Sequence, residues 1–562
     1  MAPLAASSAY VVAGLLVAAS GCGAPSAPPS PAPAAVDVRP RALTVGVGQS
    51  RRLGAFATSA DGRRFPLTAG VRWSSSDRGV VDVTGGTVRA ISPGTARVAA
   101  AFSSLVGAAE VQVTATPPPL GPLAVSPHNP RYFETPDGQV VYLTGSHTWS
   151  NLRDNGTVDP PPAFDYPAYL DFLQAHGHNF FRLWAWEQQK WTQQLAGNYW
   201  FSPGPWARPG PGYAQDGKPR FDLTRFDENY FDRLRSRVQQ AAARGIYVSV
   251  MLFDGWSVAT KGKFTLDNPW RGHPFNVVNN TNGIDGDPNR DGLGLESHTL
   301  AIPAVIAREE AYVRRVVDAV NDQENVLYEI SNESDPGARD WQYHMIELVR
   351  GYEAGKTQRH PIGMTAAWPN GSNSDLTAGP ADWISPNGDL KNPPPADGSK
   401  VILNDTDHLC GICGSAAWVW KSLTRGLNPI LMDGYDGTAK GLGAAGYDPA
   451  DPVWPAVRLN LGYARAYAQR MDLAAARPRG DLASSGYCLA RVGSEYLVFV
   501  PGGGTVTVDL GAASGPLIVE WFDPATGGSA PGGELAGGAR RSLTAPFGDE
   551  DAVLFVHRGQ DR

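Results

Sequence analysis

Between residues 123 and 473, short and almost continuously apolar runs alternate with longer stretches in which hydrophobic residues recur at helical spacing. Such apolar runs are typical of strands buried on both faces of a parallel sheet. The eight runs cover residues 139–145, 179–186, 246–253, 325–331, 361–367, 382–387, 400–405 and 428–433. Eight units predict a (β/α)8 TIM barrel over residues 123–475, with insertions in its loops. An open doubly wound sheet is the alternative, but residues 143–152 lack a Gly-rich nucleotide-binding loop.

The pattern changes on both sides of this region. Residues 36–116 and 479–560 carry short runs of alternating polar and apolar residues, separated by Gly, Ser and Asp turns. This period of two predicts a small antiparallel β-sandwich on each flank. The proline-rich residues 117–122 predict a stiff linker between the first sandwich and the barrel.

The N-terminus predicts export. Residues 9–19 form an apolar run that is too short to span a bilayer, and small residues follow it. "AASGC" resembles a bacterial lipoprotein signal, which implies a signal peptide over residues 1–22, a lipid on Cys22 and a membrane anchor. Residues 23–35 are then a Pro/Ala-rich linker. The alternative is a cleaved signal peptide and a secreted protein; both place the protein outside the cytoplasm.

Charge and composition limit the classes of function that the protein can have. The formal net charge of -7, with 18% charged residues, gives no basic surface for nucleic acid, so we expect no nucleic-acid partner. We expect a monomer. The chain has 16 Trp, and aromatic faces bind sugar rings, although large cores also contain Trp. Export permits a disulfide between Cys410 and Cys413.

Polar residues gather where the apolar runs end. "VLYEISNESD" ends a run with several carboxylates, and in a barrel the active site lies at this end of the strands. The candidate site residues are Arg182, Asn332, Glu333, His147, Trp149, Trp186, Glu187, Trp256, Asp405, Asp407, His408 and Tyr435. Glycosidic bond cleavage needs one carboxylic acid and one carboxylate that flank the bond. Glu333 and Asp405 lie on opposite strands of a barrel, and Arg182 would keep the second carboxylate ionised. Glu329 is interpreted as a hydrogen-bonded interior residue.

Several stretches resemble known families. "VLYEISNES" and "GHNFFRLWAW" look like the fourth and second strands of clan A glycoside hydrolases, and residues 123–560 look like apiosidase-like barrels with a collagen-binding-type C-terminal sandwich. The resemblance implies Glu333 as acid/base, Asn332 as partner of the sugar 2-hydroxyl, and Asp405 as nucleophile of a retaining enzyme. Residues 36–116 resemble a bacterial immunoglobulin-like group 2 domain.

The chain departs from the clan A pattern at the seventh strand, where Asp405 replaces Glu. Its shorter side chain leaves retaining and inverting outcomes open. Asp407, two residues further, points to the same face of an extended chain and could take the role instead.

An acidic loop follows the third run. Asp285, Asp287, Asn289, Asp291 and Glu296 have EF-hand-like spacing, although Arg290 stands at the usual glycine position. We expect a structural Ca²⁺ there and no cofactor for catalysis.

Three functions are compatible with the sequence. The first is a glycoside hydrolase acting on a polysaccharide or oligosaccharide. The second is a carbohydrate-binding or adhesion protein without catalysis. The third is a metal-dependent hydrolase that uses Asp405, Asp407 and His408.

Overall fold

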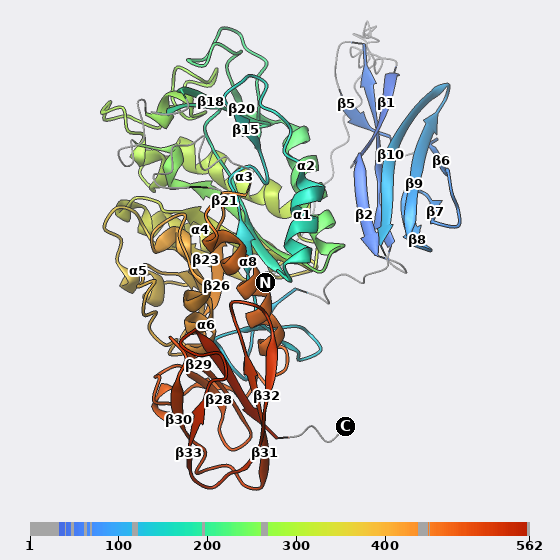
Figure 1. Cartoon of the computed structure of the whole chain (residues 1–562). Coiled ribbons are helices and arrows are strands. Elements are labelled where there is room, and N and C mark those ends of the chain that lie inside the picture. Colours follow the sequence, from blue (N-terminus) through green and yellow to red (C-terminus); the bar gives the residue numbers. More distant parts are fainter. Residues whose placement is uncertain are drawn as a thin grey trace, which may run out of the picture.

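Figure 1 shows the computed structural model, which describes residues 33–39, 41–46, 50–60, 64–67, 70–114, 122–193, 197–259, 268–435, 448 and 450–558. The predicted signal peptide, Cys22 and the linker up to residue 32 lie outside the described residues. Within the described ranges, no helix combines the length and the apolar character that a membrane span needs.

The centre of the molecule is an eight-stranded parallel sheet that nearly closes into a barrel. Its strands are β14 (Gly145–His147), β16 (Phe180–Leu183), β21 (Tyr247–Asp254), β22 (Val326–Asn332), β23 (Ile362–Thr365), β24 (Trp383–Ser385), β25 (Val401–Asp405) and β26 (Asn428–Met432). They pair in the order β14-β26-β25-β24-β23-β22-β21-β16. This confirms the prediction of eight parallel strands.

The two ends of the sheet approach each other at Gly145. The Asn179 backbone N–H donates to the Thr144 carbonyl at 3.0 Å, and a Cβ on Gly145 would lie 2.1 Å from the Phe180 carbonyl oxygen. Only glycine allows β14 and β16 to lie this close.

The prediction for the first strand was wrong in its position. Residues 140–141 form β13 (Val140–Val141), which pairs antiparallel with β12 (Phe133–Glu134) and through it with β11 (Ala124–Val125). The barrel strand begins only at Gly145. One apolar run therefore supplies both a strand of this small sheet and a barrel strand.

Helices surround the barrel in Figure 1. They are α1 (Tyr166–Ala175), α2 (Glu228–Ala242), α3 (Pro303–Val320), α4 (Arg339–Glu353), α5 (Asn373–Ala378), α6 (Ala416–Thr424) and α8 (Val453–Ala468). In α2, the buried Tyr230, Phe231, Leu234 and Val238 recur at helical spacing, and Asp227 caps the first turn.

Loops at the C-terminal ends of the strands contain further short elements. They are β15 (Asp154–Gly156), β17 (Lys190–Gln193), β18 (Gly197–Ser202), β19 (Trp206–Ala207), β20 (Asp222–Phe226), and the 3₁₀ turns η1 (Gly255–Ser257), η2 (Pro269–Gly272), η3 (Leu295–His298), η4 (Pro336–Ala338) and η5 (Thr406–His408).

The N-terminal region is a separate antiparallel-rich module, seen at the right of Figure 1. Its strands are β1 (Pro33–Arg39), β2 (Ala42–Gly46), β3 (Ser50–Arg52), β4 (Gly54–Ser59), β5 (Arg64–Pro66), β6 (Arg72–Ser75), β7 (Val81–Thr84), β8 (Thr87–Ala90), β9 (Gly94–Phe102) and β10 (Leu105–Thr114). They form three sheets around one valine- and alanine-rich core. The immunoglobulin-like assignment stays a prediction.

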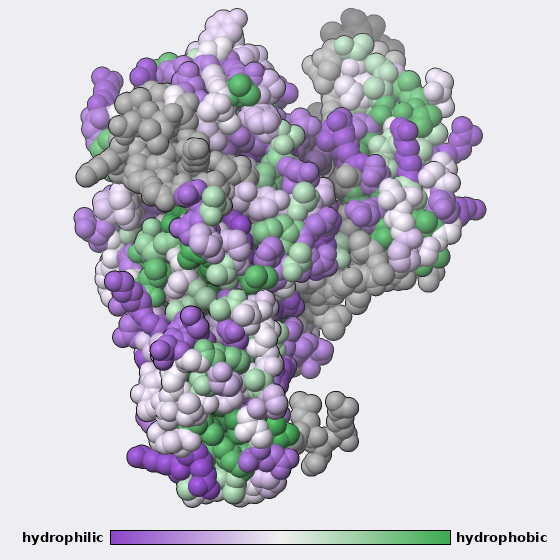
Figure 2. Space-filling model, in the orientation of Figure 1, coloured by the Kyte–Doolittle hydropathy of each residue, from purple (hydrophilic) through white to green (hydrophobic). Residues whose placement is uncertain are grey.

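The C-terminal region contains a six-stranded and a two-stranded antiparallel sheet. Its elements are β27 (Arg477–Pro478), η6 (Gly480–Leu482), β28 (Cys488–Arg491), β29 (Glu495–Val500), β30 (Thr505–Asp509), β31 (Pro516–Phe522), β32 (Ser529–Ala536), β33 (Arg540–Thr544) and β34 (Ala552–His557). Figure 1 shows α8 running between this module and the barrel. On the face shown in Figure 2, hydrophilic residues cover much of the barrel and the N-terminal module, with smaller hydrophobic areas between them.

Candidate active site

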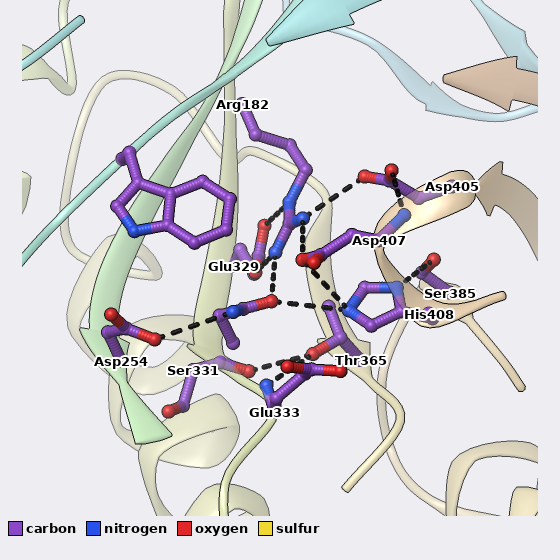
Figure 3. Close-up of polar contacts among 12 residues, drawn as sticks. Arg182, Asp254, Glu329, Ser331, Glu333, Thr365, Ser385, Asp405, Asp407 and His408 are labelled. Atoms are coloured by element: carbon purple, nitrogen blue, oxygen red, sulfur yellow. Dashed lines mark hydrogen bonds and ion pairs between the residues drawn. The ribbon is translucent and has the colours of Figure 1, made fainter. Parts of the chain in front are cut away.

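Arg182 of β16 lies at the centre of a buried polar network at the C-terminal end of the barrel (Figure 3). Its guanidinium donates to both carboxylate oxygens of Glu329 at 2.8 and 2.5 Å, and to Asn332 Oδ1 at 2.6 Å. It also donates to Asp405 Oδ2 at 3.1 Å and to Asp407 Oδ2 at 2.9 Å. Burial lowers the pKa of Arg182, but these carboxylates outweigh it and hold the pKa well above its ordinary value. Arg182 therefore stays charged, and the interior position predicted for Glu329 is confirmed.

Asp405, the last residue of β25, faces Arg182 and His147. His147 of β14 donates from Nε2 to both Asp405 oxygens, at 2.9 and 3.1 Å, and stacks on Trp184. Burial raises the pKa of Asp405, but the His147 and Arg182 charges prevail and hold it well below its usual range. His147 is itself fully buried.

His408 is held as a neutral imidazole. Its Nε2 lies 3.2 Å from Asn332 Oδ1, and its Nδ1 lies 2.7 Å from the Ser385 hydroxyl. Asn332 Oδ1 already accepts from Arg182, so Nε2 carries the proton and Nδ1 accepts from Ser385. Burial, together with the charge of Arg182, lowers the pKa of His408 to about 3.

Glu333 follows β22 in a left-handed backbone conformation, with φ 44°. This region is unfavourable for non-glycine residues, and such outliers gather at functional sites. Its backbone N–H donates to Thr365 Oγ1 at 3.3 Å. A Cβ on Gly255 would lie 2.3 Å from the Glu333 carbonyl oxygen, so η1, which follows β21, can pack against this turn only because residue 255 is glycine.

The Glu333 carboxylate lies beside aromatic rings. Trp256 donates its indole N–H to Glu333 Oε2, and Trp256 and Trp368 stack with ring centroids 5.3 Å apart. Both tryptophans are half-buried. An acid beside a pair of flat rings is suited to a sugar, because rings pack against its apolar face.

The remaining predicted residues lie around this centre. Trp149 and Trp186 contact Trp184, at centroid distances of 6.4 and 5.9 Å. Tyr435 packs on Phe172 and Tyr169 of α1, at 4.7 and 5.3 Å. The structure thus brings Arg182, Asn332, Asp405, Asp407, His147 and His408 into one network and puts Tyr435 in an aromatic cluster.

Glu187 belongs to a second polar cluster. Its oxygens contact His273 Nε2 and His298 Nε2, each at 3.1 Å, and accept from the Asp254 backbone N–H at 2.9 Å. Burial raises the pKa of Glu187, but the histidine charges hold it below its usual range. The sequence-based list omitted both histidines, because they lie in loops far from any strand end. Asp254 ends β21, and its Oδ1 accepts from Asn332 Nδ2 at 3.4 Å.

The acidic loop brings together part of the predicted calcium ligand set. Oxygen atoms of Asp287, Asp291 and Glu296 all lie within 4.8 Å of one another. Asn289 donates its amide to Asp291 Oδ2 and to Glu296 Oε1, and Asp285 accepts from the Asp287 backbone N–H at 3.0 Å. The oxygens Asp287 Oδ1 and Glu296 Oε2 are buried and have no hydrogen-bond partner among the described residues.

Cys410 and Cys413 form a disulfide in the loop that follows β25 and η5. The Cys410 and Gly411 backbone N–H groups donate to the Thr406 carbonyl at 2.9 and 2.8 Å, which ties this loop to the turn carrying Asp407 and His408. Cys488 is buried and free, and burial raises the pKa of its thiol to about 12.

Comparison with known proteins places this arrangement among barrel folds. A family model described as a domain of unknown function (DUF6298) matches residues 185–368. No curated protein matches the chain by sequence. A Bacteroides vulgatus ATCC 8482 protein provisionally described as a glycoside hydrolase is similar in structure, with a TM-score of 0.51 and 12% identity over 92% of this chain and 100% of that chain. A glycoside hydrolase family 5 protein from the same organism has a TM-score of 0.49 and 15% identity over 79% of this chain and 95% of that chain. At these identities the likeness concerns the fold: the chain has a barrel fold similar to that of the first protein.

Proposed function

We propose that the protein is a glycoside hydrolase that cleaves O-glycosidic bonds of a polysaccharide or oligosaccharide with two carboxylates. The observation that carries this proposal is the position of Glu333. It is held in a left-handed conformation beside Trp256, directly after Asn332, which belongs to the Arg182 carboxylate network.

The chemistry follows from two different environments. We propose that Glu333, which is buried beside the Trp256 indole, acts as the acid that protonates the leaving oxygen. The second carboxylate comes from the Asp405 and Asp407 pair, which Arg182 holds. The Asn332 amide nitrogen points away from Arg182; one of its N–H groups donates to Asp254 Oδ1 at 3.4 Å, and we propose that the other donates to a sugar hydroxyl.

A guanidinium already occupies the space between the two aspartates, which disfavours the metal-dependent alternative. Arg182 donates to Asp405 and Asp407 with the same nitrogen, and His408 Nε2 donates to Asn332. We propose that catalysis requires no cofactor.

The setting of the enzyme is part of the proposal. The resemblance of residues 1–22 to a lipoprotein signal favours a protein outside the cytoplasm, either anchored through Cys22 or secreted. We also propose that the protein is a monomer. The Cys410–Cys413 disulfide is of the kind that oxidising compartments permit.

The test is product release from a panel of plant and microbial polysaccharides and aryl glycosides. We expect Glu333→Gln to lower turnover by at least about 100-fold, because the amide cannot donate the proton that the leaving group needs. Glu347→Gln, an exposed change on α4, is the matched control and should keep full activity.

Two results would contradict the proposal. Wild-type turnover in a folded Glu333→Gln variant would remove Glu333 from catalysis. Binding of a glycan by the wild-type protein without any product release would favour the non-catalytic carbohydrate-binding function.

A further inference from the structure

The carboxylate that acts with Glu333 needs an oxygen that can reach the sugar. It either attacks the anomeric carbon or takes a proton from the attacking water. In both cases the bond to the leaving oxygen breaks, its electron pair stays on that oxygen, and Glu333 supplies the proton. An oxygen whose lone pairs are already bonded to protein donors is poorly placed for either step.

Asp405 has no such oxygen. Its side chain is 1% exposed. Oδ2 accepts from Arg182 and His147, and Oδ1 accepts from His147 and from the Asp407 backbone N–H at 3.0 Å. The last bond makes Asp405 the N-cap of η5, so its carboxylate is folded back onto the turn that follows it. In Figure 3 this carboxylate points toward Arg182, and the Asp407 carboxylate lies closer to Glu333.

Asp407 is placed differently. Its side chain is 6% exposed, and Arg182 donates to Oδ2, whereas Oδ1 accepts no hydrogen bond from the described residues. Oδ2 also lies 3.7 Å from His408 Nε2, and His408 in turn contacts Asn332, the neighbour of Glu333. In Figure 3 the Asp407 carboxylate lies between Arg182 and His408, on the side of Arg182 that faces Glu333.

We propose that Asp407 is the second catalytic carboxylate and that Asp405 is a positioning residue that fixes the η5 turn and Arg182. This inference rests on the proposed glycosidase function and departs from the family resemblance, which points to the last residue of β25.

The charge of Asp405 also affects the pKa of Asp407. Burial raises the pKa of Asp407, Arg182 lowers it, and the neighbouring charge of Asp405 raises it again, with a net increase above the ordinary value. Removing the Asp405 charge should therefore lower the pKa of Asp407. A purely structural role for Asp405 would leave that pKa where it is.

The test compares Asp407→Ala and Asp405→Ala in the presence of azide, with the best aryl glycoside from the panel. Azide fits the space left by a missing carboxylate and attacks the anomeric carbon in its place. We expect Asp407→Ala to lose activity by on the order of 1,000-fold or more and to regain turnover with azide, giving a glycosyl azide. We expect no glycosyl azide from Asp405→Ala. The reverse pattern would overturn the inference.

Asp405→Asn covers the case in which Asp405→Ala does not fold, because it keeps the shape of the side chain. We expect it to retain activity within about 100-fold of wild type, with the acid limb of its kcat/KM profile moved to lower pH. Asp407→Asn should lose activity as Asp407→Ala does, and Asp389→Asn, an exposed change, should behave as wild type.

Different results would contradict the glycosidase function and the Asp407 assignment. Wild-type silence across the panel counts against the glycosidase function, and the Asp407 assignment falls with it. A wild-type enzyme that loses activity in Glu333→Gln but keeps it in Asp407→Asn refutes the Asp407 assignment alone.

Discussion

Glu309 of α3 is a fully buried carboxylic acid on the outer side of the barrel. Its Oε2 accepts from the Trp341 indole at 2.8 Å, and Oε1 has no partner among the described residues. Burial raises the pKa of Glu309 well above its ordinary value. The native protein therefore binds a proton that the unfolded chain releases above about pH 4.3. The free energy of unfolding must fall as the pH rises above that value, until the pKa of the folded state is reached.

Glu309→Gln should remove this loss, because a neutral amide of the same shape replaces the acid. We expect the variant to match wild type near pH 4 and to be more stable at pH 8 by about 1 kcal/mol or more. Urea unfolding at both pH values is the measurement. Equal stabilities at pH 8 would show that Glu309 is ionised in the folded protein.

At the scale of single residues, the sequence shows which residue types lie near the strand ends but not which chemical role each of them has. Asn332 and Glu333 stand out in the sequence because they directly follow a strong apolar run, and Arg182 stands out because it interrupts another. Strand ends meet at one face of a barrel. The choice between Asp405 and Asp407 could not be made, because it depends on η5, a single 3₁₀ turn that folds one carboxylate back onto the backbone. Nothing in the sequence indicates that Glu187 contacts His273 and His298, because both are far away in the chain.

Elements were predictable where one apolar run forms one strand. Seven runs coincide with barrel strands, whereas residues 139–145 contain β13 and only the first residue of β14. The break between them lies within Tyr142, Leu143 and Thr144, which are all buried, so hydrophobicity alone gives no sign of it. Helices such as α2 follow from periodicity, because one face packs on the barrel.

The acidic loop between β21 and α3 is expected to bind Ca²⁺. Asp287, Asp291 and Glu296 converge, and burial together with the Asp291 and Asp285 charges raises the pKa of Asp287, so a bound cation would relieve their repulsion. We expect the melting temperature to rise with Ca²⁺ and to fall on chelation. Saturation at 100 times Kd corresponds to about 2.7 kcal/mol.

The matched variant for this test is Asp287→Asn with Glu296→Gln. It keeps the size of both side chains and removes two of the three charges. Its melting temperature should no longer respond to Ca²⁺. A wild-type melting temperature that is the same with Ca²⁺ and with chelator would exclude a structural calcium in this loop.

At the scale of the whole molecule, the modules differ in how they join the barrel. Arg39 of β1 pairs with Asp232 of α2 at 2.5 Å, a polar contact between the N-terminal module and the barrel. The C-terminal module (residues 477–557) instead shares an apolar cluster with α6 and α8, which includes Trp420, Tyr467, Phe522 and Phe555. The pattern of polar and apolar residues predicted three folded regions. It cannot show that two of these regions share one core, because that depends on which faces of α6, α8 and the C-terminal sheet pack together.

This shared core predicts that the barrel and the C-terminal module unfold together. Phe522 is 5% exposed and contacts Trp420 of α6 and Tyr467 of α8, at centroid distances of 5.6 and 5.2 Å. Phe522→Ala should lower the free energy of unfolding by about 3–5 kcal/mol. In calorimetry, the unfolding temperature of the barrel should fall together with that of the C-terminal module.

Val519→Ala, inside the core of the C-terminal module, serves as the comparison and should lower the same unfolding temperature by a smaller amount. Two separate unfolding transitions, with an unchanged unfolding temperature for the barrel in Phe522→Ala, would mean that the C-terminal module unfolds independently of the barrel.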